Sequence, residues 1–325
     1  MSGNDRKTGD ILSKEKIHKT SIGGQAVIEG VMMRGPKEMA VAVRKSNGEI
    51  VLDKKPLDTK MRKLNFLKWP IIRGIIGFVD SLVLGTKTLM FSAELYDVEG
   101  EEDETYQPTK FDLFLEKLFK NKNAYIYASV VIALVLGVAM FVVLPAIITN
   151  YVTIYVQNGV VRSLIEGGVR MAIFLAYVSL TAMNKDIKRV FQYHGAEHKS
   201  IACYEHGQEL TVENVRNHSR FHPRCGTSFL IEVMIISVLV FSVVSWDSLI
   251  TRILIKVALF PLVAGLAYEF IKFAGRSDSK IIAALNQPGM WLQRITTNEP
   301  DDEQIEVAIH SLNAVIPENK EEDKW

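Results

Sequence analysis

Cysteine is scarce in this sequence, and an excess of charge of either sign is missing. The 325 residues include two cysteines, Cys203 and Cys225, so we expect no framework of disulfide bonds. Lysine and arginine number 38 against 37 aspartates and glutamates, so there is no global attraction to nucleic acid, and we expect no such partner. The first 60 residues lack an apolar core of about 7 to 15 residues, so we expect no secretory signal.

Long uncharged apolar stretches dominate instead. A helix needs about 20 apolar residues to cross the hydrocarbon core of a bilayer, which is roughly 30 Å thick. Four stretches meet this requirement: 124–148, 164–183, 227–244 and 249–273. We therefore predict a mainly α-helical integral membrane protein with about four transmembrane helices, solvated by the lipid bilayer.

The second and fourth stretches carry charges near one end. Glu166 and Arg170 stand one turn apart, as do Arg252 and Lys256. Their long side chains are expected to reach the lipid headgroups.

The basic residues of the connections predict the orientation. The connection at 184–226 contains seven Lys and Arg, whereas 150–163 contains one and 245–248 contains none. Basic loops stay in the cytoplasm, so we place 184–226 there. A disordered basic N-terminus at 1–21 and C-terminal helices at 274–316 then lie on the same side, which requires an even number of crossings.

A fifth apolar stretch, 66–91, contains Arg73, Asp80 and Lys87 at intervals of seven residues. On a helix these charges form one stripe. We therefore interpret the stretch as an interfacial or re-entrant helix rather than a span.

The segments outside these apolar stretches are predicted to lie outside the membrane. Asn47-Gly48 between β-forming residues predicts a hairpin, and 26–33 can add a strand, giving a small β-unit at 22–57. We expect an acidic linker and an amphipathic segment at 92–123 and a disordered tail at 317–325.

Within the β-unit, Gly23-Gly24 and Gly30 mark tight turns or a close approach of the backbone. Glu29 and Arg34 are candidates for a functional site. They can equally be ordinary exposed strand residues.

Five of the seven histidines and both cysteines lie between His194 and Cys225. Residues 194–198 read HGAEH, the H-x-x-E-H pattern, which on a helix puts His194 and His198 on one face where they can share a metal ion. This is the inverted form of a zinc-peptidase motif, in which the carboxylate between the histidines acts as the base. We predict a divalent metal, zinc for preference, with Glu197 as the general base.

The sequence leaves the third ligand of the metal open. The turn at 222–226 offers His222 or Cys225 as a third ligand, and Cys203 and His206 are alternatives at the end of the same helix. Cys203 can also be a small buried hydrophobic residue. Glu232 and Glu269 line a polar site under the loop, or form salt bridges with one of three basic residues: Arg220, Arg224 and Lys272.

Two functions from different classes fit these residues. The first is a metal-dependent hydrolase acting on a membrane-proximal substrate. The alternative is a non-catalytic scaffold, or an assembly or quality-control factor, that binds other membrane proteins and whose cluster is a closed four-ligand site or a polar network. A third function, a transporter, is supported less well. Transporters usually have broken helices or internal repeats in their spans, and the sequence shows neither convincingly.

With these residues identified, the chain resembles the YqhQ-like family of bacterial multi-pass membrane proteins, domain of unknown function 1385. The similarity runs in order along the chain through six segments: GGQAVIEGVMMRG at 23–35, YHGAEHK at 193–199, CYE at 203–205, LTVENV at 210–215, HPRCGTSF at 222–229 and WLQRITTNEPDDEQIEVAI at 291–309. The resemblance implies a bacterial plasma membrane and a metal-dependent protein without an assigned reaction.

Overall fold

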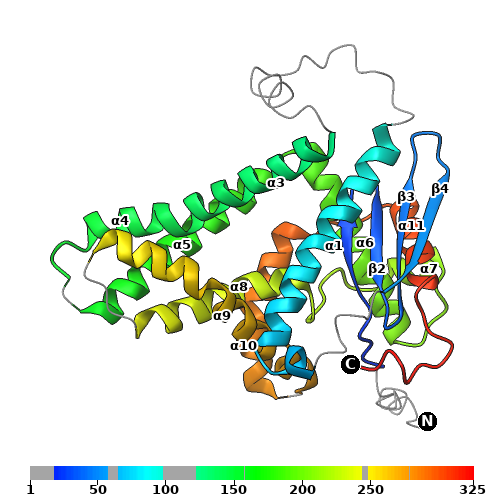
Figure 1. The fold of residues 1–325 in the computed structure, drawn as a ribbon. Helices are drawn as coiled ribbons and strands as arrows, with labels where there is room; N and C mark the ends of the chain where they lie inside the picture. Colours follow the sequence, from blue (N-terminus) through cyan, green and yellow to red (C-terminus); the bar gives the residue numbers. More distant parts are fainter. Residues whose placement is uncertain (1–17, 58–64, 98–121, 157, 244–247, 278) are drawn as a thin grey trace, which may run out of the picture.

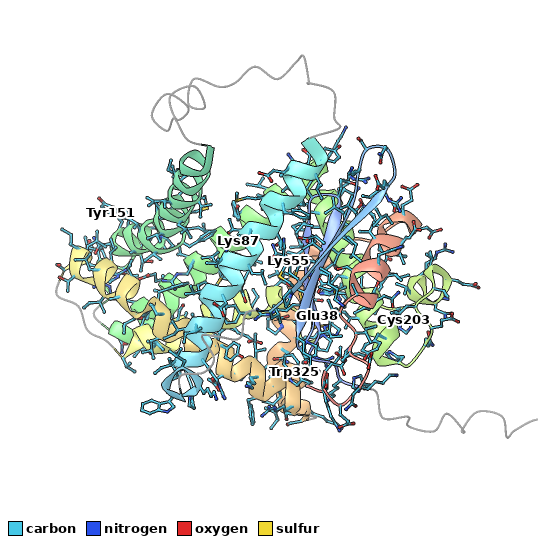
Figure 2. The ribbon with its side chains drawn as sticks, turned by 45° about the vertical axis from the view of Figure 1, so that its right-hand side comes forward. Glu38, Lys55, Lys87, Tyr151, Cys203 and Trp325 are labelled. Carbon is cyan, nitrogen blue, oxygen red and sulfur yellow. The ribbon has the colours of Figure 1, made fainter. Side chains whose placement is uncertain are left out.

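A computed structural model gives the structure of the chain and describes residues 18–57, 65–97, 122–156, 158–243, 248–277 and 279–325. The predicted basic N-terminus at 1–21 and the predicted linker at 92–123 lie largely outside these residues. The chain forms two parts, a helical part and a part built around a small sheet (Figure 1). Tyr151 lies on the helical part, and Cys203 lies inside the sheet-containing part (Figure 2).

The N-terminal residues form one antiparallel sheet of four strands in the order β1-β2-β3-β4. The strands are β1 Gly23–Val27, β2 Gly30–Arg34, β3 Glu38–Arg44 and β4 Ile50–Pro56. The predicted hairpin at Asn47-Gly48 joins β3 to β4, and Gly48 has a φ of +89°, which glycine adopts without strain. The sheet is therefore larger than predicted by one strand.

Both faces of this sheet are covered, which explains why β3 reads as an almost unbroken apolar run. Val31 and Met33 point into one core, and Met32 and Val41 point into the other. Side chains alternate between the faces of a strand, so both sets are buried only when both faces are packed.

The helical part contains six α-helices and one π-helical turn among the described residues. They are α1 Ile72–Asp97, α3 Lys122–Val138, η3 Ala139–Val143, α4 Leu144–Val152, α5 Gly159–Thr181, α8 Gly226–Ser242 and α9 Leu249–Arg276. A 3-10 turn, η2, precedes α1 at Asn65–Lys68.

Four helical segments in the described residues are long and apolar enough to cross a membrane: Ile72–Tyr96, Ala128–Val152, Gly159–Thr181 and Leu249–Arg276. The number of candidate spans agrees with the prediction, but they are not the same four segments. The stretch predicted at 227–244 is α8, which has 17 residues and falls among the shorter apolar helices. The stretch at 66–91, predicted as interfacial or re-entrant, contributes to one continuous helix of 26 residues that does not turn back.

Helix α1 joins the two parts. Near its start, Gly74 approaches Gly265 of α9 so closely that an added Cβ would lie 2.9 Å from the Gly265 carbonyl oxygen. Further along, Leu84 and Phe91 pack against the sheet. The charged residues of α1 that were expected to form one stripe have different surroundings. Arg73 forms an ion pair with Glu269 of α9, whereas Lys87 is exposed.

The other face of the sheet is covered by α6 Lys185–Glu205 and α11 Asp302–Asn313 (Figure 1). Helix α7 Val212–Arg216 lies against both of these helices, and α10 Lys280–Thr296 packs on α8. One core joins Met33, Tyr193, Val215 and Leu312. Segments far apart in the sequence therefore fold into one unit, which must lie on one side of any membrane that the helices cross.

The charges near the starts of α5 and α9 were expected at the headgroups, and the structure corrects this. Glu166 accepts hydrogen bonds from Arg170 (3.0 Å) and Arg252 (2.7 Å) and also contacts Lys256. All four residues are buried between the helices. Screening is weak between packed helices, so the carboxylate attracts the three cations strongly, and this attraction offsets part of the cost of removing their charges from water.

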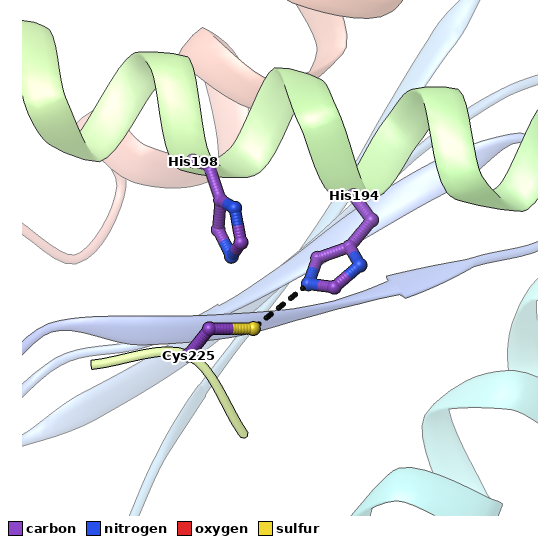
Figure 3. A group of neighbouring side chains, drawn as sticks. All are labelled: His194, His198 and Cys225. Carbon is purple, nitrogen blue, oxygen red and sulfur yellow. Dashed lines mark hydrogen bonds between the residues drawn. The ribbon is translucent and has the colours of Figure 1, made fainter. Parts of the chain in front are cut away.

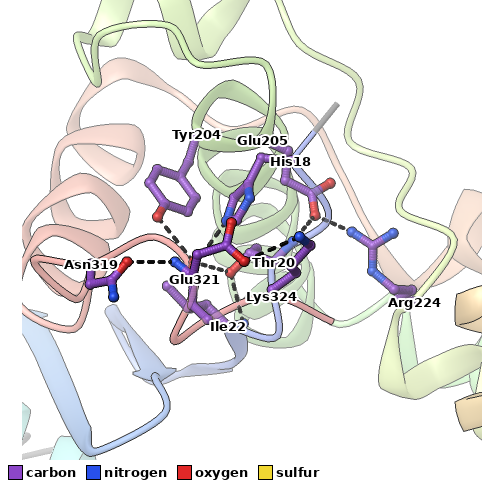
Figure 4. Close-up of polar contacts among 10 residues, drawn as sticks. His18, Thr20, Ile22, Tyr204, Glu205, Arg224, Asn319, Glu321 and Lys324 are labelled. Carbon is purple, nitrogen blue, oxygen red and sulfur yellow. Dashed lines mark hydrogen bonds and ion pairs between the residues drawn. The ribbon is translucent and has the colours of Figure 1, made fainter. Parts of the chain in front are cut away.

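The C-terminal tail is also ordered, contrary to the predicted disorder at 317–325. Asp323 is fully buried and accepts hydrogen bonds from the hydroxyls of Thr20 (2.6 Å) and Tyr204 (3.0 Å). The N–H of Trp325 donates to the carbonyl oxygen of Lys19 (2.9 Å). Figure 4 shows Thr20 and Tyr204 of α6 among the polar contacts of the C-terminal tail. The charged composition of the tail predicted disorder. The composition could not predict that the Asp323 carboxylate accepts hydrogen bonds from buried hydroxyl groups.

Candidate metal centre

Helix α6 carries the H-x-x-E-H motif and presents both of its histidines to the same point (Figure 3). The helix begins at Asn184, whose side chain accepts from the N–H groups of Asp186 and Ile187. Four positions correspond to about one turn, so His194 and His198 lie with their ring centroids 4.4 Å apart.

Cys225 completes the cluster from the start of α8. As the N-cap residue its side chain accepts from the N–H of Thr227, and this turn directs its sulfur toward α6. The Sγ lies 3.3 Å from Nε2 of His194. The ligating atoms of His194, His198 and Cys225 all lie within 4.8 Å of one another.

The outer nitrogens of both rings are held by backbone carbonyls. Nδ1 of His194 lies 2.8 Å from the Thr296 oxygen, and Nδ1 of His198 lies 2.6 Å from the Arg220 oxygen. A carbonyl only accepts, so both Nδ1 atoms carry a proton and donate. Each Nε2 therefore faces the cluster, and that of His198 is buried without a hydrogen-bond partner in the described part of the chain. Metal-binding histidines have this arrangement, in which the outer nitrogen donates and fixes the ring.

The charges of the cluster favour a thiolate. Burial alone would raise the pKa of the Cys225 thiol, but the imidazoles of His198 and His194 outweigh it and hold that pKa well below its usual value. Burial opposes protonation of His194, yet Cys225 beside it raises the His194 pKa to about 9. The thiolate is the form of cysteine that binds metal, and a cation bound there would take the place of the proton on Nε2 of His194, so the residues present fit a cation.

Glu197 lies beside the cluster and is buried, with 5% of its surface exposed. One side of its carboxylate accepts the N–H of Gly24, whereas Oε2 has no hydrogen-bond partner among the described residues. Burial raises the pKa of this carboxyl group. A carboxylate with one fixed and one open oxygen can accept a proton from a molecule in the site.

The Gly-Gly pair at the start of β1 lies beside this carboxylate. A Cβ on Gly24 would lie 2.9 Å from the carboxyl carbon of Glu197 and 2.6 Å from the carbonyl oxygen of Met32. Gly23 has nothing within 4 Å of such an atom. The expected close approach of the backbone thus occurs at Gly24, where β1 passes the His/Cys cluster, and also at Gly30, where a Cβ would clash with the Ala42 carbonyl oxygen.

The cluster opens into a cavity of about 830 Å³ between the sheet, α6, α1 and α9. His194, His198, Cys225 and Glu197 all line it. A ligand in this cavity can therefore reach the cluster and the open oxygen of Glu197.

The other predicted ligands lie elsewhere. His222 is near, with its ring centroid 5.6 Å from that of His198, but its Nε2 faces Glu205 at 3.5 Å and it is outside the three-residue cluster. Cys203 lies in the core, with its sulfur 3.6 Å from the Glu209 carbonyl oxygen, as expected for a buried hydrophobic residue. His206 packs its ring on that of His218 and is exposed.

The other carboxylates predicted to line the site, those of Glu29, Glu269 and Glu232, lie outside the three-residue cluster. Glu29, with a φ of +48°, forms an ion pair with Arg189 and accepts from the hydroxyl of Tyr193 at 3.2 Å, so it anchors α6 to the sheet. Glu269 pairs with Arg73 rather than lining the cluster. Glu232 is buried in α8, and its Oε2 has no hydrogen-bond partner in the described chain.

Arg34 is a different case, because it lines the large cavity. It therefore remains a candidate for contact with a ligand.

Sequence reasoning missed the backbone groups that hold the site. The carbonyls of Thr296 and Arg220 fix the histidines, and the side chain of Gln293 bonds both the N–H (2.9 Å) and the carbonyl (2.9 Å) of His222. Every residue has a carbonyl, so the sequence carries no signal for these roles.

Comparisons with known proteins agree with the resemblance. The family model described as "Protein of unknown function (DUF1385)" matches residues 69–318. The chain is 37% identical over 309 residues to a Bacillus subtilis (strain 168) protein named "Uncharacterized protein YqhQ", covering 94% of this chain and 95% of that protein. No solved structure matches the chain.

Proposed function

The chain belongs to the DUF1385 family, whose function is unknown, and we propose that it is a metal-dependent membrane hydrolase. In this proposal His194, His198 and Cys225 bind a divalent ion, zinc for preference, and the substrate is a membrane-proximal molecule. The observation that carries the proposal is the convergence of three ligating atoms within 4.8 Å at the wall of a large cavity.

The donor set favours zinc and an open coordination position. Imidazole nitrogen and thiolate sulfur are the usual zinc ligands, and hard cations such as magnesium prefer oxygen. Structural zinc sites usually have four protein ligands, whereas catalytic sites have three and leave one position open. Three ligands beside a cavity therefore favour the hydrolase over the scaffold with a closed site.

The protein groups have distinct roles in this proposal. A bound ion supplies a water molecule whose pKa is lowered to about 7 and polarises the carbonyl or phosphoryl group under attack. Glu197 accepts the proton of the attacking water through its open oxygen and later returns it to the leaving group. Gly24 holds the other side of that carboxylate, and the carbonyls of Thr296 and Arg220 hold the two imidazoles.

We also propose a topology with four crossings in the bacterial plasma membrane and both ends of the chain in the cytoplasm. The sheet, α6 and α11 share one core, so they must lie on one side. Crossing by α3–α4, α5, α8 and α9 satisfies this requirement, whereas an additional full crossing by α1 would not. Seven basic residues at 184–226 support the cytoplasmic side.

Metal analysis of the purified full chain tests the proposal. After metal-replete expression, elemental analysis is expected to give about one equivalent of zinc per chain. The double variant His194→Ala, His198→Ala should lose it and still insert into the membrane. The pair His206→Ala, His218→Ala, whose rings pack on each other away from the cluster, is the matched control and should keep it. Less than about a tenth of an equivalent in the unaltered protein would remove the proposal.

Glu197→Gln separates the hydrolase from the scaffold. The amide keeps the size of the side chain and its hydrogen bond from Gly24 but cannot take up a proton. We expect this variant to bind zinc normally and to fail in complementing a deletion of the gene. Full complementation would favour the scaffold.

A further inference from the structure

The cavity beside the candidate metal centre lies where the helical part meets the sheet-containing part. Its lining includes Gln25 of β1 and Phe191 of α6 from the sheet-containing part. Leu84 of α1 and Ile271 of α9 line it from the helical part. Its volume, about 830 Å³, is within the range of sites that enclose small molecules, roughly 300 to 1,000 Å³.

The charged side chains of the lining are mostly cationic. Glu197 is the one carboxylate side chain among the lining residues, and it faces the metal cluster. The lining cations are Arg34, Arg224, Lys272, Arg276 and Lys324. Arg224 is already paired with Glu205, and Lys324 with Glu321, so these two are partly neutralised.

Lys272 and Arg276 stand one turn apart at the C-terminal end of α9. The nearby carboxylate, Glu269, is engaged by Arg73. In the described chain, neither Lys272 nor Arg276 has a carboxylate within salt-bridge distance. An anion in the cavity can therefore bind both cations without displacing an existing partner.

The position of this pair relates it to the bilayer. Helix α9 has 28 residues and is apolar enough to cross a membrane, and Lys272 and Arg276 occupy its last two turns. Basic side chains at the end of a span reach the level of the lipid headgroups. The following helix, α10, exposes Ile281 (73%) and Leu285 (51%), as expected of a helix at the same interface.

The rest of the lining suits a hydrocarbon chain. Apolar side chains come from the sheet edge, α6, α1, α9 and the C-terminus: Leu57, Leu84, Phe191, Ile201, Ile271 and Trp325. The cavity thus combines cationic side chains at headgroup depth with apolar side chains from the helical part, the sheet-containing part and the C-terminus.

We infer that the cavity binds an anionic amphiphile, a lipid with a phosphate headgroup, whose phosphate contacts Lys272 and Arg276 and whose chain lies against Leu84 and Ile271. As a statement about the substrate class, this rests on the proposed function. The binding itself requires no metal, so it can be tested separately.

Isothermal titration of the full chain in an uncharged detergent tests the inference with three probes. They are dihexanoyl phosphatidate, its neutral-headgroup counterpart dihexanoyl phosphatidylcholine, and glycerol 3-phosphate, which has the phosphate without the chains. Dihexanoyl phosphatidate is expected to bind at least about tenfold more tightly than either of the others, because it combines acyl chains with a net negative phosphate. Phosphatidylcholine has the chains, but its choline neutralises the phosphate charge. Equal binding of glycerol 3-phosphate would indicate a soluble phosphate ligand, and equal binding of phosphatidylcholine would remove the role of charge. Either result would overturn the inference.

The double variant Lys272→Gln, Arg276→Gln locates the site. It should weaken binding of dihexanoyl phosphatidate by about tenfold or more, since two charge-assisted hydrogen bonds are lost. Lys280→Gln is the matched control, because Lys280 is exposed, begins α10 and does not line the cavity. Unchanged binding in the double variant would overturn the inference.

Zinc content, measured on the same samples, separates this inference from the proposed function. The double variant should retain as much zinc as the unaltered protein. Selective phosphatidate binding by a protein without zinc would leave the inference standing and remove the metal proposal.

Discussion

Nε2 of His194 lies 3.3 Å from the sulfur of Cys225, although 31 positions separate the two residues. One is in the middle of α6, and the other caps the start of α8, a helix of the apolar part. The candidate metal centre therefore ties the sheet-containing part to the helical part, and the cavity lies along that junction.

Replacing Cys225 by serine should weaken zinc binding by at least about tenfold, because a hydroxyl does not ionise near neutral pH and is a poor zinc ligand. Competition with a zinc chelator measures the change. Cys203→Ala is the control, since Cys203 is buried in the core away from the cluster. Equal affinities in Cys225→Ser and the unaltered protein would exclude the sulfur as a ligand.

Replacing Gly24 by alanine should destabilise the protein by about 1–3 kcal/mol, because the added methyl group meets the backbone oxygen of Met32 at 2.6 Å. The same methyl group meets Glu197, so complementation should fall as well. Thermal unfolding in detergent measures the first effect. Gly23→Ala is an adjacent control with nothing within 4 Å, and equal effects of the two substitutions would contradict the close approach.

The sequence predicted the pair of imidazoles but could not choose the third ligand. Spacing along one helix fixes the relation of His194 to His198, whatever the rest of the chain does. The choice of Cys225 over His222 depends on how the turn before α8 meets α6. Gln293 and Glu205 hold His222 away, and both contacts are tertiary.

The limits of the membrane prediction have a similar origin. Apolar length found three of the four helical segments that are long enough to cross, but it counted α8, which has 17 residues, and left out α1, which passes from α9 onto the sheet. The expectation that Arg170 and Lys256 reach the headgroups failed because Glu166 gives them a buried partner. The spacing of Glu166 and Arg170 is visible in the sequence, but the contact of Glu166 with Arg252 and Lys256 is visible only once α5 and α9 are packed together.

Replacing Glu166 by glutamine should destabilise the helical part by about 3–5 kcal/mol, because it leaves Arg170, Arg252 and Lys256 around a neutral group. Thermal unfolding in detergent should show a large loss. Glu213→Gln, at an exposed position of α7, should change stability little. Comparable stability of the two variants would mean that the buried ion cluster contributes little to folding.

We expect the contribution of Glu205 to the stability of the fold to be lost in acid. Burial would raise its pKa, but His222 and Arg224 outweigh burial and lower it. A carboxylate with a lowered folded-state pKa stabilises the fold above its unfolded-state pKa, about 4.3, and this stabilisation disappears as the pH falls through the folded-state pKa. The stability difference between the unaltered protein and Glu205→Gln should therefore be constant near pH 7 and shrink below about pH 4.3. A difference that grows toward acid pH would reverse the assigned direction.

X-ray absorption at the zinc edge of the purified full chain tests the central claim most directly. Binding by His194, His198 and Cys225 predicts one sulfur at about 2.3 Å, two imidazole nitrogens at about 2.0–2.1 Å and one further light atom at the open position. A zinc spectrum without a sulfur neighbour, or metal-replete protein that contains no zinc, would contradict it.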